Sequence, residues 1–343
     1  MLFALLIVLT AAVAAAVLTG VVRQRVLARG LLDVPNARSS HVVPTARGGG
    51  VAIVAVVLVA TAWLVWAGAA DAMVALGLLA GGALVAGIGF LDDRGHVPAP
   101  LRLLVHIVAL GGALAAVGGL PPVPWGGRSV DLGLAGDVFA CLACVWFLNL
   151  FNFMDGIDGI AASEAAFVAF AAAWLAGSTG APSSLVVLWL VTGAAALGFL
   201  MWNWPPARIF MGDVGSGFLG FALALLLVYS TGQSALNFWT AVILTAPFVA
   251  DATVTLVARI TRGERWYSAH RSHAYQWLSR RWGSHARVTA LFILVNGVLV
   301  LPAAWWSVLR PERGPALALA VLLALGVAAR VAGAGRPEHE ARH

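Results

Sequence analysis

The segment NLFNFMDGIDGIA, residues 149–161, combines two asparagines and two aspartates with two glycines. Asn149, Asn152 and Asp155 follow one another at three-residue spacing, so they share roughly one face if a helix continues through them. Amide and carboxylate oxygens are hard donors of the kind that bind Mg²⁺ together with phosphate oxygens. Glycines let the chain turn and bring backbone N–H groups close to a ligand. The segment therefore predicts a metal and phosphate site, with an ordinary Asp-Gly turn as the alternative.

Three further aspartates lie in segments far from this one. Asp92 and Asp93 are adjacent, and such a pair can hold a hard cation or remove a proton with a pKa raised by its like-charged neighbour. A solvated helix end beside Arg94 is the alternative for that pair. Asp213 opens a Gly/Ser stretch, where it can cap the following helix. Placed opposite Asn152, Asp213 would instead complete a clamp for a metal ion and a pyrophosphate at a helix N-terminus.

A short basic segment, HRSHAYQ, supplies His270, Arg271 and His273. Histidine and arginine together form a compact cationic cluster that suits binding or neutralising a diphosphate. A zinc site is less well supported, because no cysteine or acidic partner stands at ligand spacing. For three later basic residues, contact with anionic lipid headgroups is the favoured interpretation. These are Arg280, Arg281 and Arg287.

The polar segments are embedded in a chain that is 61% apolar and only 10% charged, with a mean hydropathy of +0.91. Soluble chains average about 25% charged residues, and an apolar run of about 20 residues suffices to cross a bilayer as a helix. We therefore expect an all-α integral membrane protein, a single polytopic domain over residues 1–343 with about eleven transmembrane helices. The expected spans are residues 2–22, 50–68, 71–90, 103–120, 135–151, 162–177, 184–202, 215–231, 236–258, 288–308 and 314–333.

Basic residues are distributed unevenly among the connections between these spans. All but three of the 21 lie on one side, the exceptions being Arg128, Arg310 and Arg313. The positive-inside rule therefore predicts an N-terminus outside and a C-terminus in the cytoplasm. On the outer side, residues 121–133 carry a proline pair and Gly-Gly, which predicts a small extracytoplasmic hairpin. The active site is expected where the cytoplasmic loops converge, at residues 23–49, 91–102, 149–162, 203–216 and 259–287.

Five motifs follow one another along the chain: RSSH with PTARGGG, then LDDR, NLFNFMDGIDG, FMGDVGS and HRSHAYQ. This set resembles that of the polyprenyl-phosphate N-acetylhexosamine-1-phosphate transferases, of the glycosyltransferase family 4 type, along nearly the whole chain. The resemblance implies an enzyme of the bacterial inner membrane that moves an N-acetylated sugar-1-phosphate from a UDP-sugar to undecaprenyl phosphate. UMP is released, and the implied cofactor is Mg²⁺ or Mn²⁺. The span count and orientation are similar to the branch that starts O-antigen or related surface polysaccharides.

The resemblance also implies roles for individual residues. Asp92 and Asp93 match the acidic pair of the family, one of which would act as base or organiser for the lipid phosphate. Asn152 and Asp213 match the positions that hold the metal on the pyrophosphate. The residues implied for the nucleotide are Asp155, Gly156, Ile157, Asp158, Asn203 and Phe210, the last stacking on uracil. The histidine-rich loop of the family is matched by His270, Arg271 and His273.

The sequence leaves the sugar and the reaction route open. HRSHAYQ differs from the consecutive histidines of the branch that transfers phospho-MurNAc-pentapeptide, and from the tight H-x-H-H of the GlcNAc branch. It is similar to O-antigen-initiating members that accept UDP-FucNAc or UDP-QuiNAc, while UDP-GlcNAc stays open. Direct attack of the lipid phosphate on the β-phosphorus is expected, with a covalent phosphoaspartate at Asp92 or Asp93 as the alternative.

Two other functions stay open: a phospho-MurNAc-pentapeptide-type transferase, and a polytopic transporter or flippase. A transporter would place ionisable residues in mid-membrane, and the one well inside an expected span is Asp251. The expected partners are undecaprenyl phosphate, a UDP-N-acetyl sugar and the lipid bilayer. No nucleic acid is expected, and a homodimer is left open.

Overall fold

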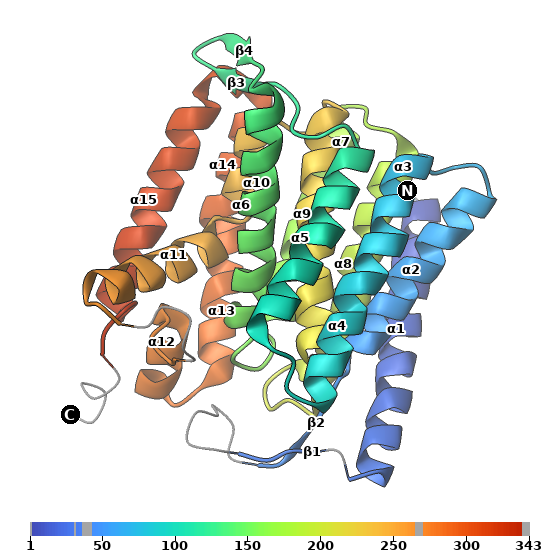
Figure 1. The fold of residues 1–343 in the computed structure, drawn as a ribbon, viewed down its shortest axis with the longest axis vertical. Helices are drawn as coiled ribbons and strands as arrows, with labels where there is room; N and C mark the ends of the chain where they lie inside the picture. Colours follow the sequence, from blue (N-terminus) through green and yellow to red (C-terminus); the bar gives the residue numbers. More distant parts are fainter. Residues whose placement is uncertain (1, 31, 36–42, 265–269, 338–343) are drawn as a thin grey trace.

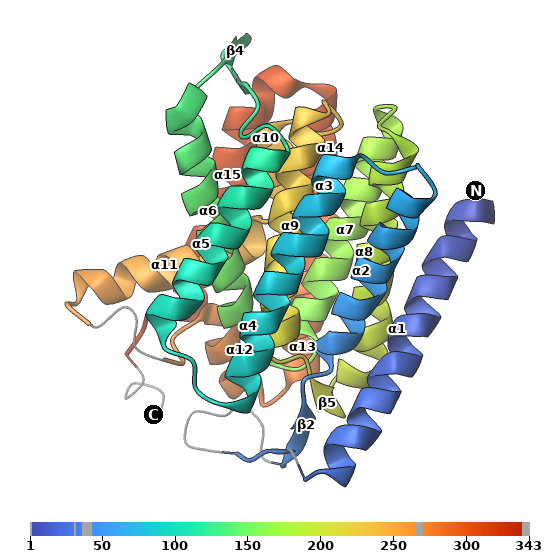
Figure 2. The ribbon, with the colours of Figure 1, turned by 45° about the vertical axis from the view of Figure 1, so that its right-hand side comes forward.

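The computed structural model describes residues 2–30, 32–35, 43–264 and 270–337. Figures 1 and 2 show a bundle in which most of the long helices run in one common direction. A small sheet lies at one end of the bundle, and a short hairpin lies at the other. Long apolar helices satisfy their own backbone hydrogen bonds, which is the condition for burying a segment in lipid.

The first half of the bundle begins with a helix of 27 residues on the outside of the molecule. Its elements are α1 (Leu2–Ala28), α2 (Gly50–Trp66), α3 (Ala72–Leu76), the π-helical turn η1 (Gly77–Gly81), α4 (Gly82–Arg94), α5 (Ala99–Ala116) and α6 (Gly133–Met154). α3, η1 and α4 form one continuous helix that ends beside the small sheet.

The second half contains the central helix of the bundle, α9, and the shorter helices next to the sheet. Its elements are α7 (Ile160–Ser178), α8 (Ser183–Asn203), α9 (Asp213–Gly232), α10 (Phe238–Leu244), α11 (Ala246–Thr261), α12 (Ala274–Trp282), α13 (His285–Val295), η2 (Asn296–Val300), α14 (Leu301–Leu309), the 3-10 turn η3 (Pro311–Arg313) and α15 (Gly314–Ala332). Of the apolar window of α9, 89% is buried by its neighbours.

All eleven expected segments are helical, but the count of eleven spans is not confirmed. Within the described residues, nine helices are long and apolar enough to cross a membrane, and α2, with 17 residues, is shorter. The expected ninth span is broken, because α10 and α11 meet at an angle of 72°. Pro247 lacks a backbone N–H and cannot extend the hydrogen-bond ladder of α10. α11 consequently lies across the direction of the other helices (Figures 1 and 2).

Two small β-structures lie at opposite ends of the bundle. β1 (Leu32–Asp33), β2 (Thr45–Arg47) and β5 (Ile209–Phe210) form a sheet in which β1 and β2 are antiparallel and β2 and β5 are parallel. β3 (Val123–Trp125) and β4 (Arg128–Val130) form an antiparallel pair. Gly126 and Gly127 both have positive φ, as a two-residue hairpin turn requires. The side of the membrane on which this pair lies stays a prediction.

Glycine lets α4 approach the start of α9 at backbone contact. A Cβ at Gly89 would lie 2.5 Å from the carbonyl oxygen of Asp213 and 2.7 Å from the backbone nitrogen of Val214. Both neighbours are main-chain atoms, so no side chain can rotate away to make room. The small size of Gly89 therefore fixes how α4 and α9 meet.

We predict that Gly89→Ala destabilises the protein by about 1–3 kcal/mol, the usual cost of overpacking. Gly87→Ala is the matched control on the same helix, since a Cβ there would meet nothing within 4 Å. Thermal unfolding in detergent compares the two variants with the wild type. Equal melting temperatures for the two variants would contradict the proposed contact.

Candidate active site

A cavity of about 470 Å³ lies at the sheet end of the bundle. Its walls come from β1, β2, the connection between α6 and α7, the start of α9, and α12 with the following turn. The predicted residues that line it are Asn152, Asp155, Gly156, Ile157, Asp158, Asn203, Phe210, Asp213 and Arg271. Sequence segments more than 100 residues apart therefore meet in one cavity, as the convergence of loops predicts.

Four predicted residues are not among those that line the cavity: Asp92, Asp93, His270 and His273. Asn149, which shares a helix with Asn152, also lies outside the lining, and its amide nitrogen donates to Val145 O within α6 at 2.7 Å. The motif RSSH, at residues 38–41, lies outside the described residues, as do residues 265–269 of the last predicted loop.

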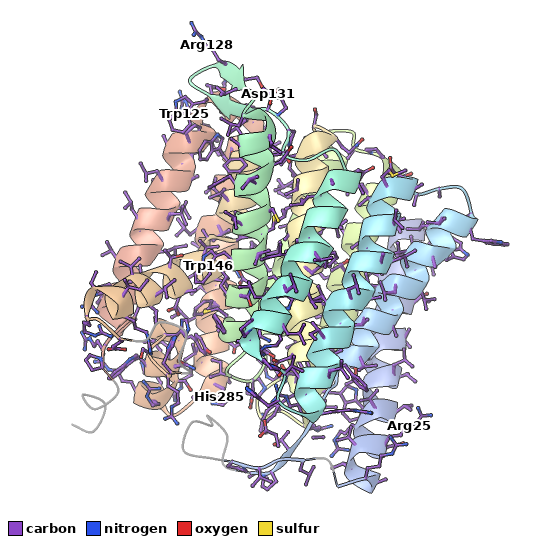
Figure 3. The ribbon with its side chains drawn as sticks, in the orientation of Figure 1. Arg25, Trp125, Arg128, Asp131, Trp146 and His285 are labelled. Carbon is purple, nitrogen blue, oxygen red and sulfur yellow. The ribbon has the colours of Figure 1, made fainter. Side chains whose placement is uncertain are left out.

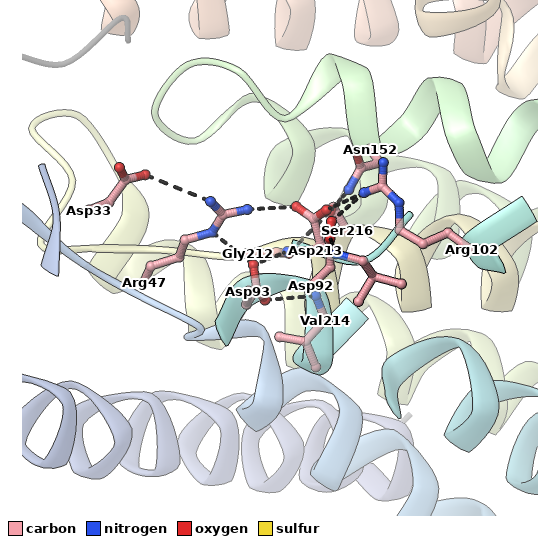
Figure 4. Close-up of polar contacts among 11 residues, drawn as sticks. Asp33, Arg47, Asp92, Asp93, Arg102, Asn152, Gly212, Asp213, Val214 and Ser216 are labelled. Carbon is pink, nitrogen blue, oxygen red and sulfur yellow. Dashed lines mark hydrogen bonds and ion pairs between the residues drawn. The ribbon is translucent and has the colours of Figure 1, made fainter. Parts of the chain in front are cut away.

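Arg47 connects three carboxylates at the edge of the cavity (Figure 4). Its Nε lies 2.8 Å from Asp93 Oδ1, its Nη2 lies 2.7 Å from Asp213 Oδ1, and its Nη1 lies 3.9 Å from Asp33 Oδ2. Burial alone would lower the pKa of Arg47, but these carboxylates outweigh it and raise the pKa above the usual value. The guanidinium group therefore stays charged beside the aspartates.

Arg102, near the start of α5, holds the same cluster from another side (Figure 4). Its Nη1 pairs with Asp92 Oδ2 and lies 3.2 Å from Asp213 Oδ2. The other oxygen of Asp92 accepts a hydrogen bond from the backbone nitrogen of Val97 at 2.8 Å. Asp213 is thus held between two guanidinium groups, one on each carboxylate oxygen.

Asp93 caps the start of α9 from a different helix. Its two carboxylate oxygens accept hydrogen bonds from the backbone nitrogens of Asp213 and Val214, at 2.9 and 3.1 Å. The first N–H groups of a helix have no partner within the helix, so an acceptor there satisfies them and complements the helix dipole. Asp93 therefore holds the backbone at which α9 begins, next to Asp213, and its role in the reaction stays a prediction.

The turn between α6 and α7 is fixed by hydrogen bonds from three other segments. The carboxylate of Asp158 accepts from the backbone nitrogen of Ala207 at 3.0 Å, and its backbone carbonyl accepts from Thr289 Oγ1 at 2.9 Å. Asn203 Oδ1 accepts from the backbone nitrogen of Gly159 at 2.9 Å, and its Nδ2 donates to Ile209 O at 3.0 Å. Asp158 and Asn203 line the cavity and also hold its walls together.

Asp155 occupies a different environment within the same turn. Burial raises the pKa of Asp155 well above the usual value. Asp213, Asp93 and Asp158 add to that effect, while Arg47 opposes it.

Phe210, expected to stack on a base, lines the same cavity and lies opposite Arg47 in the register of β2 and β5.

A family model described as Glycosyl transferase family 4 matches residues 75–231 of the chain. The decaprenyl-phosphate N-acetylglucosaminephosphotransferase of Mycobacterium leprae is 30% identical over 364 residues, which cover 94% of this chain and 88% of the relative. The chain belongs to glycosyl transferase family 4, the polyprenyl-phosphate N-acetylhexosamine-1-phosphate transferases.

Two other relatives show how the similarity is distributed. A probable undecaprenyl-phosphate N-acetylglucosaminyl 1-phosphate transferase of Bacillus subtilis is 28% identical, over 82% of this chain and 79% of the relative. A phospho-N-acetylmuramoyl-pentapeptide-transferase of Mycolicibacterium vanbaalenii is 42% identical over 87 residues, 24% of this chain and 23% of the relative. The expected family and the multi-pass membrane location are confirmed.

The three residues of the expected cationic cluster lie in different environments. The rings of His270 and His273 stack with centroids 4.9 Å apart. Burial, together with the neighbouring His273 and Arg259, lowers the pKa of His270 to about 3, while Asp251 opposes the shift. His270 is therefore neutral near pH 7, and its part in binding a diphosphate stays a prediction. Of the three residues, Arg271 is the one that lines the cavity.

Four residues at the site did not stand out in the sequence as candidates: Arg47, Arg102, Ser216 and His285. Arg47 belongs to the motif PTARGGG, so its position in a family motif could have indicated a role at the site. Ser216 lies one turn after Asp213 and accepts a hydrogen bond from Asn152 Nδ2 at 2.8 Å. His285 Nδ1 lies 3.2 Å from Asp158 Oδ2, and Figure 3 shows it at the opposite end of the molecule from Arg128. Its sequence context gave no signal.

We predict that Arg47→Lys lowers sugar-1-phosphate transfer by about 10- to 100-fold, because a lysine cannot make the forked contacts that position two carboxylates. Arg25→Lys is the matched control, since Arg25 lies near the same end of the molecule but outside the cavity lining (Figure 3). Initial rates at saturating substrate measure the effect. A rate for Arg47→Lys equal to that of the control would disprove the role of the fork.

A second prediction concerns His270 and pH. Because its pKa is about 3 in the folded protein against 6.5 in an unfolded chain, the unfolded state binds more protons between those values. His270 therefore makes stability fall as pH drops below about 6.5. The melting temperature of His270→Gln should fall less steeply than that of the wild type between pH 7 and pH 5. Parallel curves for the two proteins would refute this.

Proposed function

We propose that this protein transfers an N-acetylated sugar-1-phosphate from a UDP-sugar to undecaprenyl phosphate, releasing UMP. The observation that supports this best is the cavity in which Asn152 and Asp213 lie together with Arg47. Oxygen donors and a guanidinium group at one helix N-terminus suit a diphosphate. The named functions of the relatives, N-acetylglucosamine phosphate transfer on polyprenyl phosphates, agree with this chemistry.

In this reaction an oxygen of the lipid phosphate attacks the β-phosphorus of the UDP-sugar. The bond from that phosphorus to the bridging oxygen breaks, and UMP leaves with the electron pair. Phosphoryl transfer of this kind depends on positioning and on neutralising charge. Arg47 and Arg271 line the cavity and would neutralise the diphosphate, while Arg102, outside the lining, pairs with Asp213.

Direct attack is favoured over a covalent aspartyl intermediate by the contacts of the acidic pair. Both oxygens of Asp93 accept backbone hydrogen bonds, and both oxygens of Asp92 have a partner, Val97 N on one side and Arg102 on the other. A carboxylate tied in this way is a poor nucleophile, because attack would first require breaking those contacts. The pair therefore acts through the placement of Asp213.

The residues present fit a magnesium ion that takes most of its ligands from substrate and water. Within the described residues, no group of three or more His, Cys, Asp or Glu side chains is arranged to hold a metal. Asn152 and Asp213 are nevertheless hard oxygen donors on one cavity, and Mg²⁺ commonly uses one or two protein ligands together with phosphate oxygens. Asn152 and Asp213 would hold Mg²⁺ or Mn²⁺, which would supply further charge neutralisation on the diphosphate.

UDP-GlcNAc is the first donor to test, because the relatives that match most of the chain carry GlcNAc in their names. The loop HRSHAYQ supports the 6-deoxy donors UDP-FucNAc and UDP-QuiNAc, and with them a role at the start of O-antigen or a similar surface polysaccharide. α1 begins toward the hairpin end of the bundle and α15 ends toward the sheet end (Figures 1 and 2), an arrangement that agrees with an outer N-terminus and a cytoplasmic C-terminus.

The transporter alternative predicts an ionisable residue free to act in mid-membrane, and Asp251 is the candidate for it. Asp251 lies in the bent helix α11 and accepts hydrogen bonds from the backbone nitrogens of Ala274 and Tyr275. Its carboxylate is therefore occupied in capping α12, where it has a structural role of the kind expected for pairing with a neighbouring helix.

The test is transfer by purified protein from radiolabelled UDP-GlcNAc, UDP-FucNAc and UDP-QuiNAc to undecaprenyl phosphate, with Mg²⁺. We expect a lipid-linked product and UMP with one donor, and at least 100-fold less product with Asp213→Ala, since a metal or charge contact in the transition state is lost. Asp131→Ala, on an exposed residue at the hairpin end, is the control that should retain wild-type rates (Figure 3). The proposal fails if no donor gives product, and the assignment of Asp213 fails if Asp213→Ala is near normal.

A further inference from the structure

Tyr275, the second residue of α12, belongs to the motif HRSHAYQ, and its side chain reaches the end of α6. Its side chain is fully buried, and its hydroxyl donates to the backbone carbonyl of Phe153 at 2.8 Å. Phe153 belongs to the last turn of α6, where carbonyl groups lack a partner within the helix. The tyrosine therefore satisfies a helix end that leads directly into the DGIDG turn.

Gly156, the first glycine of the DGIDG turn, lies in close contact with the hydroxyl of Tyr275. A Cβ at this position would lie 2.1 Å from the hydroxyl oxygen of Tyr275 and 3.0 Å from its Cζ. Gly156 is not among the glycines with positive φ, so its backbone conformation is open to alanine. The close approach to Tyr275 is thus the reason that this position requires glycine.

The backbone of Tyr275 is held at the same time from the other side. Asp251, only 2% exposed, accepts hydrogen bonds from the backbone nitrogens of Ala274 and Tyr275 at 2.8 and 3.1 Å. His273 stacks on the ring of Tyr275 with centroids 5.6 Å apart. The start of α12 is therefore fixed by α11, while its tyrosine side chain reaches α6.

We propose that Tyr275, held by Asp251, is a positioning residue that fixes the HRSH loop at a set distance from the DGIDG turn. The inference rests on the proposed function. Tyr275 connects two walls of the cavity. Arg271 precedes α12, Asp155 and Gly156 belong to the DGIDG turn, and all three line the cavity. Tyr275 itself is not part of that lining, so it acts on the UDP-sugar through these neighbours.

The experiment is a double-mutant cycle of Gly156→Ala and Tyr275→Phe, read as KM for the UDP-sugar and for undecaprenyl phosphate. Tyr275→Phe keeps the ring and removes one hydrogen bond, so kcat/KM for the UDP-sugar should fall about 3- to 10-fold. The KM for undecaprenyl phosphate should stay at the wild-type value. Gly156→Ala should lower kcat/KM for the UDP-sugar at least 30-fold, because the added methyl group collides with the hydroxyl of Tyr275.

Combining the two changes should restore part of the loss, since removing the hydroxyl takes away the atom nearest to the new Cβ, and the remaining tight contact of 3.0 Å to Cζ needs a smaller shift of the ring. The double variant is expected within about 3-fold of Tyr275→Phe alone, which is strong non-additivity between contacting residues. Tyr229→Phe, a buried tyrosine of α9 outside the cavity lining, is the matched control. It should leave both KM values unchanged and should not rescue Gly156→Ala.

Asp251→Asn provides a second measurement if Gly156→Ala does not fold. It removes one of two backbone hydrogen bonds and should raise KM for the UDP-sugar, as Tyr275→Phe does, without changing KM for undecaprenyl phosphate. Additive effects in the cycle, or equal shifts of both KM values in Tyr275→Phe and Asp251→Asn, overturn the positioning role while leaving the reaction intact. Absence of product from the wild type overturns the proposed function, and this inference with it.

Discussion

Compensation of negative charge where α4 meets α9 is the constraint on which the rest of the site depends. Asp92, Asp93 and Asp213 lie together there, and carboxylates this close would repel one another in a poorly solvated setting. Arg47 and Arg102 bridge them in pairs, and the backbone N–H groups that begin α9 add a partial positive charge. The set is only partly buried, with the Arg47 and Arg102 side chains 38% and 30% exposed, so removing one partner should cost more than the loss of a surface ion pair and less than the loss of a fully buried one.

This arrangement of charges is possible because backbones approach one another closely. A Cβ at Gly50 would lie 2.3 Å from Gly215 Cα, so α2 touches α9 without intervening side chains. The parallel register of β2 and β5 sets Arg47 opposite Phe210, three residues before Asp213. The cations are thus placed by the packing of distant segments before any substrate arrives. Charges fixed in advance need no reorganisation when phosphate charge develops during transfer, which is how preorganised sites lower a barrier.

The sequence was informative about helices and about which motifs would meet. Apolar runs of sufficient length form helices in all eleven expected segments, and many polar residues at the ends of those runs line one cavity or, as Asp93 does, pair with a residue that lines it. The bend at Thr245 was not predictable, because a proline near a helix start is compatible with either a kink or a break. The sequence also does not indicate which groups pair with each charged side chain. Helical periodicity gives the face on which a residue lies, whereas Asp93 caps a backbone 120 residues away.

The broken ninth span explains why a carboxylate occurs in its apolar sequence. A straight continuation of α10 would carry Asp251 into the bundle, where an ionised group without partners would be costly. The 72° bend instead turns α11 sideways toward the edge of the molecule (Figures 1 and 2) and brings Asp251 to the start of α12, whose N–H groups it satisfies. α12 in turn places Tyr275 under the carbonyl of Phe153 and against Gly156. The bend, the buried acid and the glycine are therefore linked physically. A departure from regular helical structure at Thr245 thus helps to position one wall of the cavity.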